Sequence, residues 1–201
     1  MFDLNWRPPW GSKGGDYLAY AEVYQDAIEI LLKNIENMVG HSYQPLPLLY
    51  LLRHYMEIRM TGLIIYSKPF SLGYKDIEKF LKNKRKSHDL LKLFQKLKEC
   101  EHYLKFPKKF EYFLKNLDSF DKKSDRFRFP EDSKGKSYFR KDAPNKKFFV
   151  ILNDPASLKR YITVVIENLG GLKNHFENVK EGKEIEDEMN RECNQEYSDS
   201  T

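Results

Sequence analysis

One apolar stretch of the sequence, residues 46–66, carries ionisable side chains near its middle. At the 100° per residue of an α-helix, Arg53, His54 and Glu57 fall in one sector of the helix surface. Glu57 follows His54 by three residues and Arg53 by four, so its carboxylate could orient the imidazole or neutralise the guanidinium. Such a combination suits general acid–base chemistry.

A second polar set, Ser87, His88 and Asp89, lies at the expected start of a later helix. His88 and Asp89 could face the first set across a helical bundle. Two histidines and an arginine are sufficient to cleave RNA with its own 2′-hydroxyl as the nucleophile and without a metal ion. The spacing of these residues is not typical of a metal site, so we expect neither a metal nor a cofactor. The candidate catalytic residues are therefore Arg53, His54, Glu57 and His88.

The same positions have a structural explanation. A buried Arg53–Glu57 pair could brace two helices, while His88 and Asp89 cap a third. A third interpretation is a cleft beside Arg53 that binds a nucleotide or another small ligand. The sequence leaves all three interpretations open.

A candidate nucleic-acid contact lies in the segment RFRFP, where Arg126 and Arg128 alternate with Phe127 and Phe129. In an extended strand the two guanidinium groups would project to one side and the two rings to the other. The arginines could then contact phosphates. Alternatively, the rings pin a loop to the bundle and the arginines pair with nearby acids.

Charge is distributed unevenly along the chain, whose formal net charge is +5. Residues 68–147 hold 24 basic and 12 acidic side chains, whereas residues 177–201 hold 3 basic and 9 acidic ones. A basic block of this kind can attract a phosphate backbone, but it is also typical of the solvated faces of amphipathic helices. The acidic segment could shield the basic surface.

Hydrophobic periodicity predicts the elements that position these residues. We expect an all-α, single-domain bundle of five to six helices with a long polar loop or small hairpin around 121–147. An N-terminal arm would occupy residues 1–15, the bundle residues 16–179, and an acidic, disordered tail residues 180–201. The helices are expected at about 16–39, within 42–68, at 74–83, from Ser87 through the apolar stripe that ends at Leu97, at 106–120 and at 155–179, the last weakened by Gly170 and Gly171. The expected N-caps are Asp16, Ser87 and Asp154.

Several protein classes are excluded or disfavoured. The apolar stretch at 46–66 is long enough to cross a bilayer, but its charged residues make a membrane span too costly. Cys100 and Cys193 are too few for a disulfide scaffold, which suggests a reducing compartment and a cytoplasmic protein. The common phosphate-loop, metalloprotease and hydrolase motifs are missing from the sequence.

Three segments, LPLLYLLRHYMEIRMTGLI, SHDLLKLF and DRFRFP, together resemble bacterial helical proteins of the HEPN (higher eukaryotes and prokaryotes nucleotide-binding) class. The resemblance covers roughly residues 15–170. It implies a helical bundle that forms a homodimer, acts in toxin–antitoxin or antiphage defence with a cognate antitoxin or other defence-system protein, and cleaves or binds RNA without metal. The class places an Arg and a His, separated by four to six residues, on a late helix. Here Arg160 and His175 lie too far apart, so the nuclease residues are not carried over.

Overall fold

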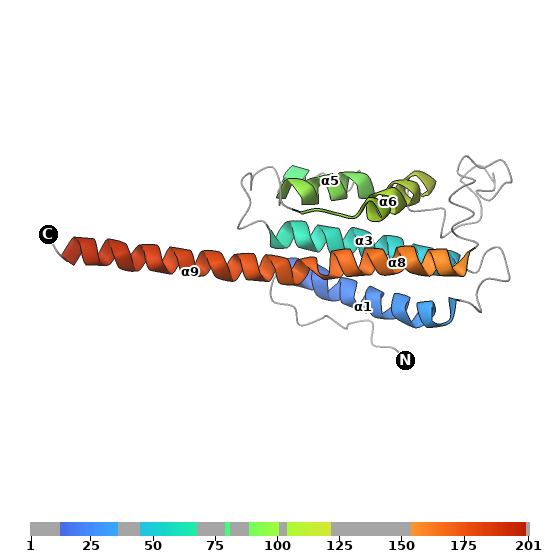
Figure 1. Ribbon diagram of the computed structural model, residues 1–201, viewed down its shortest axis with the longest axis horizontal. Coiled ribbons are helices and arrows are strands. Elements are labelled where there is room, and N and C mark those ends of the chain that lie inside the picture. The colour runs from blue at the N-terminus through green and yellow to red at the C-terminus, as the bar shows by residue number, and fades with distance from the viewer. Residues whose placement is uncertain are drawn as a thin grey trace.

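The computed structural model describes residues 13–35, 45–67, 79–80, 89–100, 104–121 and 154–199. Within these ranges the fold is an all-α bundle, as the sequence predicts, and the described residues contain no strand (Figure 1). The helices are α1 (Lys13–Lys33), α3 (Leu46–Tyr66), α5 (Leu90–Cys100), α6 (Lys108–Phe120), α8 (Pro155–Gly170) and α9 (Leu172–Asp199).

Helix α3 occupies the centre of the bundle. Helix α1 lies along one side of it and the α5–α6 pair lies along the other, while α8 packs against both α3 and α6 (Figure 1). Nearly every side chain of α3 is at least partly buried, which agrees with its apolar sequence. The other helices each bury one stripe against α3 or its neighbours, as amphipathic helices do. Residues in the core include Leu18, Ile28, Leu52, Met56, Leu93, Leu97, Phe113, Leu117, Ile162 and Val165.

Gly62 marks a close crossing between α1 and α3. A Cβ atom at this position would lie 2.9 Å from Leu18 Cδ2 and 3.0 Å from Tyr17 Cβ. Both distances are shorter than ordinary van der Waals contact, so the two helices can approach this closely only because the residue has no side chain. Helix α3 continues past Gly62 to Tyr66.

Two of the expected helix starts are wrong. Helix α1 begins at Lys13, so Asp16 lies within its first turn and does not precede it. Helix α5 begins at Leu90 and its N-cap is Asp89, whose Oδ1 accepts a hydrogen bond from Lys92 N at 3.1 Å.

The predicted start of α8 is confirmed. Asp154 precedes Pro155, and its Oδ2 accepts a hydrogen bond from Ser157 N at 3.2 Å. This hydrogen bond lowers the pKa of the Asp154 carboxyl group. The expected interruption at Gly170 and Gly171 is also present, because α8 ends at Gly170 and α9 begins at Leu172.

The C-terminal segment differs from the disordered tail expected at 180–201, because α9 continues as one helix to Asp199. Its residues are mostly Glu, Lys, Asn, Met and Gln, and several of these have high intrinsic helix propensity. The helix extends well beyond the end of the bundle (Figure 1). Residues 181–199 are called the C-terminal arm below.

Several expectations concern residues outside the described ranges. These are most of the helix at 74–83, the loop or hairpin at 121–147, and nearly all of the N-terminal arm. Among the helices that the structure does describe, none has the length and apolar character needed to cross a bilayer.

Candidate functional site

Arg53 lies in the interior of the bundle. Its side chain is 0% exposed, and its Nε is 3.4 Å from Oδ2 of Asp121, which is also 0% exposed. Asp121 is the residue at which α6 ends. The guanidinium of α3 is thus paired with a carboxylate at the end of another helix. Since an unpaired charge in such a place is strongly destabilising, the pair ties α6 to α3.

Sequence reasoning missed Asp121 as a partner of Arg53, although a signal for it exists. At 100° per residue, Asp121 falls in the middle of the apolar stripe formed by Phe110, Leu114 and Leu117. An acidic residue on such a stripe needs a buried partner. The neighbouring carboxylate of Asp118 is also buried, and its Oδ1 accepts a hydrogen bond from Leu90 N at 2.9 Å.

Glu57 lies on α3 one turn after Arg53 and is only 7% exposed. Both residues are buried, as are most side chains of α3. No three His, Cys, Asp or Glu side chains in the described part of the chain lie close enough together to hold a metal ion.

His54 faces a different neighbour from Arg53. Its ring is half-buried and stacks on Tyr50, with centroids 5.5 Å apart and planes at 22°. On its other side it contacts Tyr24 of α1, with centroids 5.3 Å apart. Burial, together with the nearby hydroxyl groups of Tyr20 and Tyr50, raises the pKa of Tyr24. His54 therefore belongs to an aromatic cluster between α1 and α3, whereas Arg53 faces α6.

The remaining candidates do not join this arrangement among the described residues. His88, Arg126 and Arg128 lie outside those ranges. Asp89, which we expected could face Arg53 or Glu57, caps α5, and its carboxylate is 3.5 Å from Lys92 Nζ. The capping role that the structural interpretation assigned to Asp89 is confirmed.

A second buried arginine, Arg59, stabilises the junction between α8 and α9. Arg59 donates hydrogen bonds to the carbonyl oxygens of Leu169 at 3.3 Å and Gly170 at 2.9 Å, at the C-terminal end of α8. A cation is favourable at this end of a helix because the last carbonyl groups have no partner within the helix. Oε1 of Glu22 on α1 lies 3.6 Å from Nη1 of Arg59 and 3.3 Å from Nζ of Lys173. This network holds the point at which α8 passes into α9.

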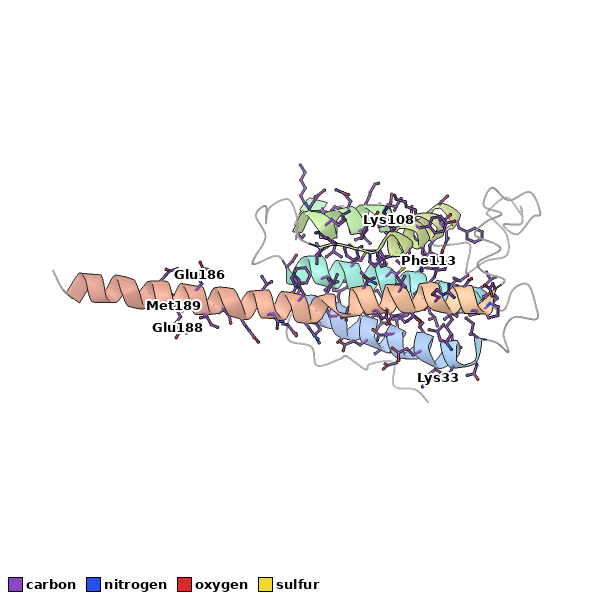
Figure 2. All side chains as sticks on the ribbon, in the orientation of Figure 1. Lys33, Lys108, Phe113, Glu186, Glu188 and Met189 are labelled. Carbon is purple, nitrogen blue, oxygen red and sulfur yellow. The ribbon has the colours of Figure 1, made fainter. Side chains whose placement is uncertain are left out.

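The C-terminal arm has a different character from the bundle. Among the described side chains of α9, Phe176 is the last that is buried, and those from Glu181 to Arg191 are exposed. Ile185 and Met189, one turn apart, are 59% and 60% exposed. Figure 2 shows Met189 projecting from the arm together with acidic neighbours, far from the bundle.

A second exposed apolar stripe lies on α1. Tyr20, Val23 and Ile30 follow one another at spacings of three and seven residues, and all three are exposed. This spacing puts them on one face of the helix. The face also carries Ala27, which is partly exposed.

The outer surface of the α5–α6 pair contains a shallow, open depression of about 430 Å³. Its apolar lining comes from Leu91 and Phe94 of α5. Lys98 lies over the ring of Phe94 at 5.3 Å and pairs with Glu111 of α6 at 3.3 Å. The depression is therefore lined by apolar and charged side chains together.

Comparison with known proteins gives no relative from which a function could be transferred. The chain shows no significant similarity to a protein-family model, a curated protein or a solved structure. The site is therefore interpreted from its own geometry.

Proposed function

We propose that this protein is a non-catalytic helical interaction module that binds a protein partner through its C-terminal arm. The observation that carries the proposal is the pair of exposed apolar side chains, Ile185 and Met189, on a helix that has left the bundle. The bundle supports the arm, and the Arg59 network fixes the direction in which the arm leaves.

The arm has the features of a helix that binds in a groove of a partner protein. Ile185 and Met189 lie about 40° apart around the helix, so both can enter one groove. Packing of an apolar face supplies most of the stability of helices in proteins. Binding would cover the two apolar side chains and add such packing. The arm holds eight acidic and two basic side chains, which favours a basic partner surface.

The burial of Arg53 favours this proposal over the ribonuclease expectation. An arginine that stabilises a reacting phosphate must touch it, whereas this guanidinium is fully buried beside Asp121. His54 is half-buried between two tyrosine rings and faces another helix. The pairing of Arg53 with Asp121 supports a bracing role.

Photo-crosslinking tests the proposal directly. A photoreactive amino acid would replace Met189 in the full chain, expressed in the cells that naturally make it. The matched control is Arg191, which is also exposed but lies about 200° further around the helix. We expect one dominant protein adduct at position 189 and a much weaker one at 191. Equal, diffuse labelling at both positions would overturn the proposal.

A cleavage assay tests the non-catalytic part. Purified protein would be incubated with structured and single-stranded RNA in the presence of a chelator. We expect no cleavage above the level of a His54→Ala variant. RNA cleavage that disappears in His54→Ala, while the variant keeps its helical circular dichroism, would establish the ribonuclease instead.

A further inference from the structure

The depression between α5 and α6, called the α5–α6 groove below, has a lysine on each of its two walls. Lys92 comes from α5 and Lys115 from α6, and both are exposed. The lining also holds the apolar side chains Leu91 and Phe94, and the ion pair of Lys98 with Glu111 joins the two walls. A ligand that fits this groove would carry both apolar and acidic side chains.

The surrounding surface of α5 and α6 is basic. Two of the carboxylates near the groove are already engaged, because Asp118 is buried against Leu90 N and Asp89 caps its own helix. The acidic side chains that reach solvent in residues 89–121, as far as the structure describes them, are Asp89, Glu99 and Glu111. The lysines of the same residues are Lys92, Lys96, Lys98, Lys105, Lys108, Lys109 and Lys115.

The C-terminal arm has the complementary pattern. Ile185 and Met189 form an apolar centre, and Glu186 and Glu188 lie about 80° to either side of it. Figure 2 shows both glutamates projecting from the arm beside Met189. The apolar and acidic side chains of the arm thus complement the apolar and lysine side chains that line the groove.

The arm cannot reach the groove of its own chain. Helix α9 is continuous from Leu172 to Asp199 and extends away from the bundle (Figure 1). The groove lies on the outer side of the α5–α6 pair, across α3 from α1. The complementary surfaces can therefore meet only between two molecules.

We propose that the C-terminal arm of one copy docks in the α5–α6 groove of a second copy, and that the exchange is reciprocal. The inference rests on the proposed function and names its partner. A reciprocal exchange is a closed, two-fold symmetric arrangement in which both copies use the same two surfaces. Contacts between the arm glutamates and Lys92 and Lys115 set the orientation, and Ile185 and Met189 become covered.

The apolar stripe on α1 is a poorer receptor for the arm. Helix α1 carries the exposed acids Glu22, Asp26 and Glu29, and Lys33 is the lysine of α1 whose side chain the structure describes. An arm with a large acidic excess would be repelled by such a surface. Charge therefore favours the α5–α6 face.

Charge reversal in the full chain tests the inference. The arm-reversed variant is Glu186→Lys with Glu188→Lys, and the groove-reversed variant is Lys92→Glu with Lys115→Glu. Sedimentation velocity over a range of concentrations measures the association of each. We expect the unmodified protein to dimerise, each variant alone to dimerise at least about tenfold more weakly, and an equimolar mixture of the two to recover the dimer. In the mixture every arm meets a groove of opposite charge.

Salt dependence gives an independent readout. Raising the ionic strength from about 0.1 to 1 M shortens the screening length from about 10 to about 3 Å, so dimerisation should weaken. Dimerisation that is insensitive to salt would contradict a charge-directed contact.

The outcomes separate this inference from the proposed function. If the arm-reversed variant loses association while the groove-reversed variant does not, the groove is the wrong receptor and the arm remains a docking element. If the unmodified protein stays monomeric at all concentrations, the inference is overturned, and the crosslinking at Met189 decides the proposed function separately. If Val23→Glu with Ile30→Glu is the change that abolishes the dimer, the interface is the α1 stripe and the inference is wrong.

Discussion

The bundle and the C-terminal arm use charged residues in opposite ways. In the bundle, Arg53 pairs with Asp121 and Arg59 binds the end of α8, so each buried guanidinium holds two elements together. In the arm, acidic side chains flank two exposed apolar ones, and no other helix among the described residues covers them. Charge in the interior thus serves the architecture, whereas charge on the described part of the arm is exposed. The comparison predicts that changes in the bundle alter stability and that changes in the arm alter association.

The largest expected effect is on the interior ion pair. Arg53→Met would leave the Asp121 carboxylate buried without its cation and should lower the free energy of unfolding by about 3–5 kcal/mol. Urea denaturation, monitored by circular dichroism, measures this free energy of unfolding. As a control, Arg160→Met changes an exposed arginine on α8 and should shift stability by no more than about 0.5 kcal/mol.

A double variant shows whether the loss comes from the stranded charge. Arg53→Met combined with Asp121→Leu replaces the pair with apolar side chains, which often restores or exceeds the original stability. A double variant as unstable as Arg53→Met alone would mean that the guanidinium does more than neutralise Asp121.

Two glycines provide the next comparison. Gly62→Ala places a Cβ 2.9 Å from Leu18 Cδ2 and 3.0 Å from Tyr17 Cβ, so overpacking should outweigh the better helix propensity of alanine. We expect a net loss of about 1–2 kcal/mol in thermal or urea unfolding. Gly182→Ala in the arm has nothing within 4 Å of its new Cβ and should not destabilise the protein. Equal effects at both positions would contradict the close α1–α3 crossing.

A pH dependence of about 1 kcal/mol should come from Tyr55. Burial raises the pKa of its hydroxyl group from 10.0 to about 12, with smaller contributions from nearby charges. Because the folded protein disfavours the phenolate, the stabilising contribution is complete below pH 10 and is lost as pH rises toward 12. Between pH 9 and 11, unfolding measurements should show a larger fall for the unmodified protein than for Tyr55→Phe. Parallel curves would rule out Tyr55 as the cause.

The smallest expected effect on stability is in the arm. Ile185→Glu with Met189→Glu replaces side chains that are already mostly exposed, so the free energy of unfolding of the monomer should change by no more than about 0.5 kcal/mol. Urea denaturation at low protein concentration provides this value. A loss of several kcal/mol would show that the arm packs on the bundle.

The sequence predicts the fold better than the site, for physical reasons. Hydrophobic periodicity marks the helices, and the Asp154–Pro155 start needs only local information. The partner of Arg53 depends on which helix packs on α3, and that is tertiary information. Glu57 is four residues from Arg53 on the same helix and is within reach of sequence reasoning, whereas Asp121 is 68 residues away. His54 adjoins Arg53 in sequence, but the 100° step of the helix turns it toward α1.

In the C-terminal segment, the expectation from composition and the structure differ. Its high charge and few aromatic residues predict disorder, because such a segment cannot form a core. The structure has a helix there, and intrinsic propensity can account for that without any core. The significance of Ile185 and Met189 became visible only with their exposure.

We divide the protein into a supporting bundle and a binding arm. The most direct test of this division is the dimerisation of a double variant that carries both Ile185→Glu and Met189→Glu. Sedimentation equilibrium would compare this full-length variant with the unmodified chain under identical buffer conditions. We predict at least about a tenfold loss of dimerisation with an unchanged unfolding transition of the monomer. Dimerisation of the variant as strong as that of the unmodified chain would contradict the role assigned to the arm.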